Sequence, residues 1–275
     1  MPEGDTIHRL AARLAPVLTG REVTGFEARR FTTETARSLV GRRIESVEAR
    51  GKNLLVRFDD ARVLHVHLQM EGKVSIERPR SAFWTAVPTS EPDLRITVPG
   101  AVVVGRRLPI CRLLPPRGAE RAPDLARLGP DLTAASFDED EAVRRLRKLA
   151  REEIGTALLV QRAVAGIGNV YKSEVLFLEG IHPCVRVSEL DDDRLRSILR
   201  RARTLLRANL GPGPRTTRRA LRGPRLWVYE RGDRPCLRCG DAIVRFVQGP
   251  PPGRSTYFCA SCQPRRDMAT EARPA

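Results

Sequence analysis

The chain has no hydrophobic run long enough to cross a membrane. No stretch of about 18 consecutive apolar residues, the minimum for a membrane-spanning helix, occurs in its 275 residues. The first residues also lack the basic region and apolar core of a secretory signal, and no internal repeat is evident. We therefore expect a protein that acts in the cytoplasm and has no membrane partner.

Cysteine is scarce, and its placement argues against a disulfide framework. Only six cysteines occur; Cys111 and Cys184 stand alone, and the other four form two Cys-x-x-Cys pairs near the C-terminus. This usage fits a reducing compartment. Two such pairs with nineteen residues between them are typical of a zinc ribbon, whose closed tetrahedral site holds one structural zinc. The predicted ligands are Cys236, Cys239, Cys259 and Cys262.

Acidic residues are outnumbered by basic ones. The chain has 49 Lys and Arg against 33 Asp and Glu, a net charge of +16 and a pI near 10.8. Such an excess predicts a polyanionic partner, either nucleic acid or an acidic membrane surface. The segment Arg194–Arg225 has eleven Arg and no acid. Charge of one sign repels itself, so this segment indicates a polyanion that balances it.

Short β-rich runs separated by Gly, Asp and Pro follow a leading helix. Asp5 is a candidate N-cap for that helix, Pro16 should kink or end it, and Gly20 should close it. The cadence of the strands predicts a β-sandwich. The expected strands are Val23–Ala28, Ile44–Arg50, Leu54–Phe58, Val63–Leu68, Val74–Ile76, Leu94–Val98 and Ala101–Val104. Residues 112–130 are rich in Pro and predict a loop that contains the hinge between two domains.

Three features of these strands are candidates for binding. Gly51-Lys52-Asn53 separates two strands and predicts a hairpin tip that presents Lys52, either to solvent or to a phosphate. His65 and His67 share one face of a strand, but no third metal ligand is evident nearby, which favours structural or nucleic-acid-facing roles. Met70 lies in the next turn, where spacing alone leaves an exposed position and a core position equally open.

The second half of the chain has helical periodicity. We expect a helix that starts at Ser136, a second over Ile154–Val164, and a third over Val170–Leu178. Ser188 and Asp191 predict a capping box for a fourth helix. The apolar stripe of that helix is Leu195, Ile198, Leu199, Ala202, Leu205 and Leu206.

The second and third of these helices flank the glycine-rich turn Gly166–Asn169 and indicate a relative of the helix-turn-helix motif. Asn169 starts the third helix, where backbone amides and the helix dipole attract phosphate. Between the cysteine pairs, Ile243–Gln248 and Ser255–Phe258 predict a hairpin with Arg254 at its tip, again suited to a phosphate.

The N-terminus is the candidate reactive site. Pro2 is small enough for the initiator Met1 to be removed, which would leave a free secondary amine beside the carboxyl group of Glu3. An N-terminal amine titrates near ~8, so a usable fraction is neutral and nucleophilic. It can form a covalent iminium, as Lys does in Schiff-base enzymes, and a buried Glu3 could act as general acid. Taken alone, Met-Pro is far more often an ordinary start site, and it is the motifs downstream that favour a reactive terminus.

Together these motifs resemble the Fpg/Nei family of DNA glycosylases, the helix-two-turn-helix repair enzymes. The resemblance covers nearly the whole chain. The glycine at position 4, rather than a leucine, resembles the endonuclease VIII (Nei) branch of the family and not the formamidopyrimidine branch. The segments that carry the resemblance are Met1–Gly4, Gly51-Lys52, Gly166–Tyr171 with Gly180–Pro183, and Gly253–Cys259.

The resemblance implies a role for each candidate residue. Pro2 would attack C1′ of a damaged nucleotide and Glu3 would protonate the opening sugar. Elimination from the iminium would then cut the strand on both sides of the lost sugar. Lys52 and Arg254 would contact phosphates and supply protons during elimination, and Asn169 would bind a phosphate. Met70 would fill the gap left by the base, which family members flip out of the duplex.

The resemblance also implies a mixed α+β fold. Residues 1–131 would form a catalytic β-sandwich with a leading helix, 132–225 a helix-two-turn-helix domain, 226–265 a zinc-ribbon finger, and 266–275 a disordered tail. We expect a monomer, bound to the bacterial nucleoid through DNA, with zinc and no small-molecule cofactor. The Nei branch implies oxidised pyrimidines as substrates.

Three other functions remain open. The first is a formamidopyrimidine-type enzyme that acts on oxidised guanine. The second is a relative that binds damaged DNA without chemistry. The third, a zinc-ribbon transcription factor, would explain the charge and the cysteines but not the N-terminus.

Overall fold

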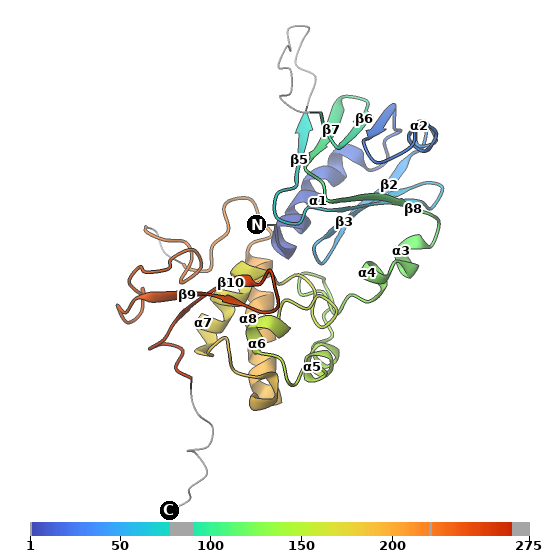
Figure 1. Ribbon diagram of the computed structural model, residues 1–275. Helices are drawn as coiled ribbons and strands as arrows, with labels where there is room; N and C mark the ends of the chain where they lie inside the picture. Colours follow the sequence, from blue (N-terminus) through green and yellow to red (C-terminus); the bar gives the residue numbers. More distant parts are fainter. Residues whose placement is uncertain (1, 78–90, 220–221, 266–275) are drawn as a thin grey trace, which may run out of the picture. The chain divides into compact units, whose positions relative to one another are not determined.

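The structure is a computed structural model that describes residues 2–77, 91–219 and 222–265. The chain divides into two compact units, Met1–Arg127 and Leu128–Ala275, and each is described by itself (Figure 1). Within the described residues, no helix is long and apolar enough to span a membrane. The predicted disordered tail, 266–275, lies outside the described residues.

The first unit packs helix α1 (Gly4–Leu18) against two antiparallel sheets of four strands each (Figure 1). One sheet has the order β1 (Gly25–Ala28), β6 (Leu94–Val98), β7 (Ala101–Arg106) and β5 (Lys73–Glu77). The other has the order β2 (Ile44–Arg50), β3 (Asn53–Phe58), β4 (Val63–His67) and β8 (Ile110–Leu114). Short helices α2 (Thr33–Arg37), α3 (Gly118–Arg121) and α4 (Pro123–Ala126) complete the unit.

A single apolar core joins the two sheets and α1. Residues from the helix, such as Leu14, are buried with Phe58 of one sheet and Ile96 of the other. The alternation of apolar and polar residues along the strands puts one face of each sheet into this core. The predicted β-sandwich with a leading helix is therefore confirmed.

Three expectations for this unit differ from the structure. Helix α1 passes through Pro16 and ends at Leu18, because a proline in the last turn removes one hydrogen bond while the buried Leu14 and Leu18 hold that turn in place. Its N-cap is Glu3, not Asp5. The predicted loop 112–130 overlaps strand β8, which pairs with β4 over its whole length, and contains α3 and α4.

The second unit is helical and carries a hairpin at its C-terminal end. Its main core is one cluster of buried apolar residues, which come from the segment between Leu132 and Leu206. The main helices are α7 (Asn169–Glu179), which is buried along most of its length, and α8 (Asp192–Ala208). Helix α8 buries the predicted apolar stripe except for Leu205, which is half-buried. The elements are α5 (Glu139–Arg147), α6 (Ile154–Ala157), α7 (Asn169–Glu179), the 3-10 turn η1 (Val187–Glu189), α8 (Asp192–Ala208), β9 (Ile243–Gln248) and β10 (Arg254–Cys259).

Helix boundaries in this unit differ from the sequence expectations. The first helix starts at Glu139, because the Asp138 side chain accepts a hydrogen bond from the amide of Glu141. The expected helix over Ile154–Val164 stops at Ala157. Asp191 caps α8 alone through the amide of Arg194, and Ser188 lies in the preceding turn.

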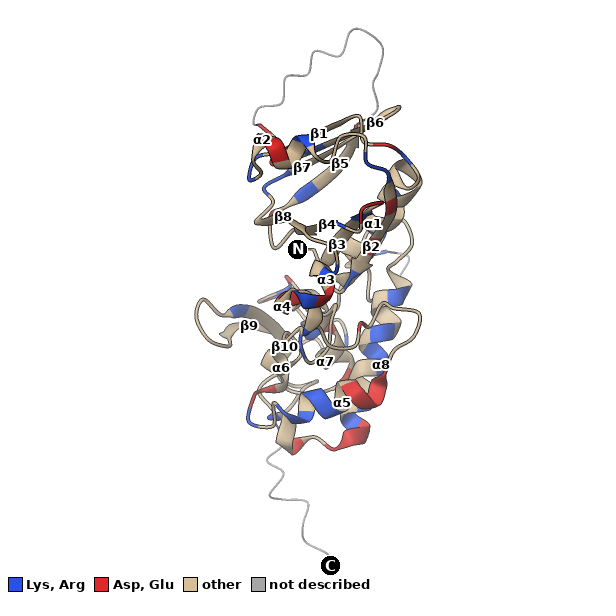
Figure 2. Cartoon of the chain, turned by 90° about the vertical axis from the view of Figure 1, so that its right-hand side faces the viewer, with Lys and Arg blue, Asp and Glu red and all other residues tan. Residues whose placement is uncertain are grey.

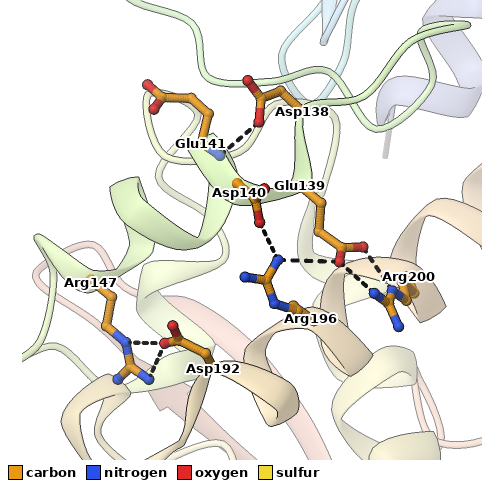
Figure 3. Close-up of polar contacts among 8 residues, drawn as sticks. All are labelled: Asp138, Glu139, Asp140, Glu141, Arg147, Asp192, Arg196 and Arg200. Carbon is orange, nitrogen blue, oxygen red and sulfur yellow. Dashed lines mark hydrogen bonds and ion pairs between the residues drawn. The ribbon is translucent and has the colours of Figure 1, made fainter.

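Helix α8 carries many basic residues (blue in Figure 2), and ion pairs with acidic residues of α5 neutralise part of this charge (Figure 3). Arg200 makes a bidentate contact with Glu139 at 2.8 and 2.9 Å, and Arg196 reaches Asp140 at 2.5 Å. Arg201 pairs with Glu179 of α7 at 2.8 Å. The expectation that only a polyanion could balance Arg194–Arg225 was therefore incomplete, since acids from other helices balance part of it.

Candidate functional site

The first turn of α1 fixes an acid directly beside Pro2. The carbonyl of Glu3 accepts hydrogen bonds from the amides of Thr6 and Ile7 at 3.0 and 3.1 Å, so Glu3 is part of the helix while Pro2 precedes it. Glu3 is fully buried and Pro2 is half-buried. Asp5 is also fully buried, and its carboxylate lies 3.5 Å from the guanidinium of Arg9. The arrangement places a desolvated carboxyl group next to the position of the predicted amine.

Lys52 occupies the tip of the hairpin that joins β2 to β3. Arg50 pairs with Asn53, so Gly51 and Lys52 form a two-residue loop, and Gly51 adopts the positive φ of 59° that such a loop requires. Lys52 is half-buried. Burial lowers the pKa of His67, and the nearby charge of Lys52 lowers it further.

Met70 lies on the surface of the turn that follows β4. Its exposed fraction of 57% decides between the two readings of this residue, since a core position is excluded. The turn borders a groove of about 500 Å³. The residues that line it are Arg29, Arg30, Gln69, Met70, Glu71, Asp93, Arg107, Leu108 and Pro109.

Asn169 and Arg254 come together in the second unit. Asn169 is the first residue of α7, and its side-chain amide donates to the carbonyl of Ser255 at 2.5 Å. Ser255 follows Arg254, which is exposed at the start of β10. The Oδ1 atom of Asn169 is buried without a hydrogen-bond partner among the described residues. One hydrogen bond thus connects Asn169 to the residue after Arg254, so the two residues predicted to bind phosphates lie on adjoining segments.

The four cysteines of the two Cys-x-x-Cys pairs converge on one point. Their sulfur atoms all lie within 4.8 Å of one another, with Cys239 and Cys259 3.4 Å apart. Burial tends to raise the pKa of the Cys236 thiol, but backbone N–H donors from Cys239 and Arg238 lower it to about 7. A set of four thiols with these separations fits a tetrahedral zinc ion and leaves no open position.

A network of buried polar side chains, which no local sequence pattern indicates, attaches the zinc-bearing hairpin to α7. Lys172 is fully buried, and its ammonium donates to the hydroxyl of Thr256 at 2.6 Å. Thr256 donates to Gln248 at 3.0 Å, which in turn donates to Glu153 at 2.8 Å. Each of the four side chains in this network has a hydrogen-bond partner, which favours one orientation of the hairpin.

Glu174 of α7 organises the segment that leads into the hairpin. Its carboxylate accepts hydrogen bonds from the amides of Trp227, Val228 and Tyr229 at 2.7–2.8 Å, and from the hydroxyl of Thr217. Trp227 also packs on Phe177 of α7. The position of Glu174 in the helix does not distinguish a buried acid from a surface one, so the sequence alone does not predict this role.

The two histidines of β4 have different environments. His65 is fully buried and hydrogen-bonded to Asn53 and Arg112, so its role is structural. Burial, with the nearby Arg112, lowers the pKa of His65 to about 4 and keeps the ring neutral near pH 7. The two rings do not form part of a metal site, because the four cysteines are the only cluster of metal-binding side chains in the described parts of the chain.

Three family descriptions match consecutive parts of the chain. Residues 1–99 match the formamidopyrimidine-DNA glycosylase N-terminal domain, 128–220 the formamidopyrimidine-DNA glycosylase H2TH domain, and 234–265 the zinc finger found in FPG and IleRS. Together with the sheets, the helical unit and the cysteine cluster, they define the class as a zinc-containing DNA glycosylase with one structural zinc site.

Relatives match over the full length. A probable endonuclease 8 2 of Streptomyces coelicolor is 40% identical over 100% of this chain and 99% of its own. The DNA-(apurinic or apyrimidinic site) lyase Nei2 of Mycolicibacterium smegmatis is 37% identical over 96% and 99%. A crystal structure of Lactococcus lactis Fpg (MutM) with N7-benzyl-Fapy-dG DNA aligns with a TM-score of 0.79 at 26% identity, covering 96% of this chain and 100% of that one. The chain belongs to the Fpg/Nei family of DNA glycosylases.

Proposed function

We propose that this protein is a bifunctional DNA glycosylase and abasic-site lyase of base excision repair. The proposal rests most directly on the buried Glu3 beside Pro2 at the start of α1. Relatives that match over their full length carry the names endonuclease 8 2 and DNA-(apurinic or apyrimidinic site) lyase Nei2. The net charge of +16 supports DNA as the partner.

Chemistry would begin after Met1, which lies outside the described residues, is removed. The neutral amine of Pro2 attacks C1′ of the damaged nucleotide, the C1′–N bond to the base breaks, and the base leaves with the bonding electron pair and takes up the proton that the amine nitrogen loses. Glu3 then gives a proton to the ring oxygen as the C1′–O4′ bond breaks, and the lone pair of the Pro2 nitrogen completes the iminium. The positive end of the fifteen-residue helix α1 disfavours a cation at its start, which favours the neutral, nucleophilic amine.

Strand cleavage would follow from the same intermediate. The iminium makes the C2′ proton acidic; its loss expels the 3′ phosphate, and a second elimination expels the 5′ phosphate. Lys52 at its hairpin tip and Arg254 at the start of β10 would hold these phosphates and supply protons, and Asn169 would bind a further phosphate. Met70, exposed beside its groove, would fill the space left by the flipped base.

The proposed substrates are oxidised pyrimidines. Gly4 and the relative named endonuclease 8 2 support this choice. A preference for oxidised guanine is the second candidate, because the family descriptions and the solved Lactococcus lactis structure concern formamidopyrimidine enzymes. Parallel cleavage of duplexes that carry thymine glycol or 8-oxoguanine separates the two, with faster cleavage of thymine glycol expected.

We further propose that the enzyme works as a monomer in the bacterial cytoplasm, without a small-molecule cofactor. In this proposal residues 1–131 carry the chemistry, residues 132–225 bind DNA through the helix-two-turn-helix, and residues 226–265 form the finger. The reduced cysteine site supports a cytoplasmic location. Analytical ultracentrifugation with and without a DNA duplex tests the monomer.

Borohydride trapping tests the mechanism. Reduction of the iminium on a duplex with an abasic site should yield one covalent protein–DNA adduct. Pro2→Ala, or any residue retained ahead of Pro2, should reduce the adduct at least about 100-fold. Mass spectrometry of the free protein should show a chain without Met1. Tight binding to abasic DNA with no adduct, at full zinc content, would instead identify a non-catalytic binding protein.

A further inference from the structure

The loop that carries Lys52 is braced by a chain of side chains from β3, β4, β8 and α4. Asn53 donates from Nδ2 to the carbonyl of Arg50, across the base of the two-residue loop, at 3.1 Å. Its Oδ1 lies 2.8 Å from Nε2 of His65. Arg112 donates from Nε to Nδ1 of His65 at 3.1 Å and from Nη2 to the carboxylate of Asp124. Asn53 and His65 are both buried.

The direction of every hydrogen bond in this chain is determined. A guanidinium group can only donate, so Nδ1 of His65 must accept and the ring hydrogen must sit on Nε2. Nε2 then donates to Oδ1 of Asn53, which leaves the Asn53 amide to donate to Arg50. A protonated His65 would direct a second N–H at Arg112, so the chain requires the neutral ring. The low pKa of His65, about 4, fits this requirement.

We propose that Asn53 and His65 are positioning residues for Lys52. The one-way chain from Asp124 through Arg112, His65 and Asn53 fixes the loop Gly51-Lys52, and so fixes where the ammonium group meets its phosphate. The chain spans three adjacent strands of one sheet, because β3 pairs with β4 and β4 pairs with β8. This inference rests on the phosphate role of Lys52 in the proposed function, and its test must separate the two.

The test compares variants that remove the polar atoms but keep the volume. Asn53→Leu combined with His65→Phe removes both partners of the central hydrogen bond and leaves neither one unpaired. We expect the double variant to cleave a preformed abasic site about tenfold more slowly than wild type. Because the phosphate contact is misplaced, the salt dependence of DNA binding should also fall by about one unit in slope, as it should for Lys52→Ala.

Combination with Lys52→Ala distinguishes positioning from general loosening. Added to Lys52→Ala, the double variant should cause no further loss, because both act through one contact. His65→Gln, which can accept from Arg112 and donate to Asn53, should recover part of the rate. Arg62→Met is the matched control: Arg62 bonds Asp60 at 2.7 Å and Ser38 at 2.7 Å at the other end of β3. It should cost stability but leave rate and salt slope unchanged.

The outcomes separate the two claims. A double variant with wild-type rate and slope, beside an impaired Lys52→Ala, overturns the positioning role and leaves the role of Lys52 standing. An unimpaired Lys52→Ala overturns the phosphate role of Lys52, and the positioning proposal with it. If the double variant does not fold, Arg112→Ala breaks the chain at a half-exposed residue, and the same loss of rate and slope is expected. Additive losses with Lys52→Ala would also contradict the proposal.

Discussion

The side-chain amide of Asn169 donates a hydrogen bond of 2.5 Å to the backbone carbonyl of Ser255. This contact joins the first residue of α7 to the residue that follows Arg254 in β10, although 86 positions separate Asn169 from Ser255 along the chain. The start of α7 and the exposed Arg254 therefore lie on adjoining segments of the second unit. Since both residues are proposed to bind phosphates, their relative placement is set before DNA arrives.

Asn169→Ala should weaken binding to a duplex with an abasic-site analogue about tenfold, with little dependence on base sequence, because a phosphate contact carries no sequence information. Fluorescence anisotropy on two unrelated sequences measures the effect. Ser197→Ala, which removes a 2.5 Å hydrogen bond to Glu179 in the same unit, serves as control and should leave the affinity unchanged. Unchanged binding by Asn169→Ala would remove this residue from the proposed interface.

Glu3→Gln should separate the two activities. Excision of a damaged base should fall at least about 100-fold, since the proton for the opening sugar is lost. Cleavage of a preformed abasic site should suffer less, because that sugar already opens in solution. Single-turnover gel assays on both substrates give the ratio. Asp5→Asn, at the neighbouring buried acid, should lower the melting temperature and keep the ratio. Equal losses on both substrates would contradict the assignment of Glu3 as proton donor.

Removal of zinc should disorder the finger and change the environment of Trp227. The side chain of Arg238, between the first two zinc ligands, lies 4.6 Å from the ring centre of Phe177 and 5.9 Å from that of Trp227. Chelation should release about one zinc per chain, shift Trp227 emission and weaken DNA binding. A Trp84→Phe background makes the signal specific, since Trp84 is the only other tryptophan in the sequence. Unaltered emission after complete zinc loss would refute this coupling.

Acid should destabilise the fold through His65. Its pKa is about 4 in the folded chain and near 6.5 when unfolded. Between these values the unfolded chain binds a proton that the folded chain does not. The contribution of His65 to the free energy of unfolding is therefore fully present above pH 6.5 and is lost as the pH drops toward 4. From pH 7 to 5 this amounts to roughly 2 kcal/mol. Urea unfolding at both pH values should show a correspondingly smaller change for His65→Gln, and equal changes would contradict the prediction.

The features predicted well are those set by short-range chemistry. The loop Gly51-Lys52 follows from a glycine between two alternating strands, and the zinc site follows from the spacing of four cysteines. Strand boundaries such as Ile44–Arg50 were correct because apolar residues recur with a period of two.

The features that were missed depend on specific contacts that periodicity does not indicate, most of them distant in sequence. Strand β8 lies beside a proline-rich segment, and pairing with β4 makes it a strand. The helix expected after Ile154 ends early because Gln161 bonds the carbonyls of Leu159 and Ile167 and the amide of Gly166, which stabilises a turn instead. Buried Lys172 and Glu174 are fixed by partners far along the chain, which no local pattern can indicate.

The boundary between Pro2 and Glu3 has a practical consequence for anyone preparing this enzyme. The hydrogen-bond ladder of α1 starts at the carbonyl of Glu3, so a purification tag left ahead of Pro2 would extend from the chain without touching that ladder. Such material is expected to fold, bind zinc and bind a duplex as the untagged protein does, yet it would present a peptide nitrogen where the proposed mechanism needs an amine. Tags therefore belong at the C-terminus, and each preparation should be checked by the mass of its N-terminus rather than by folding assays alone.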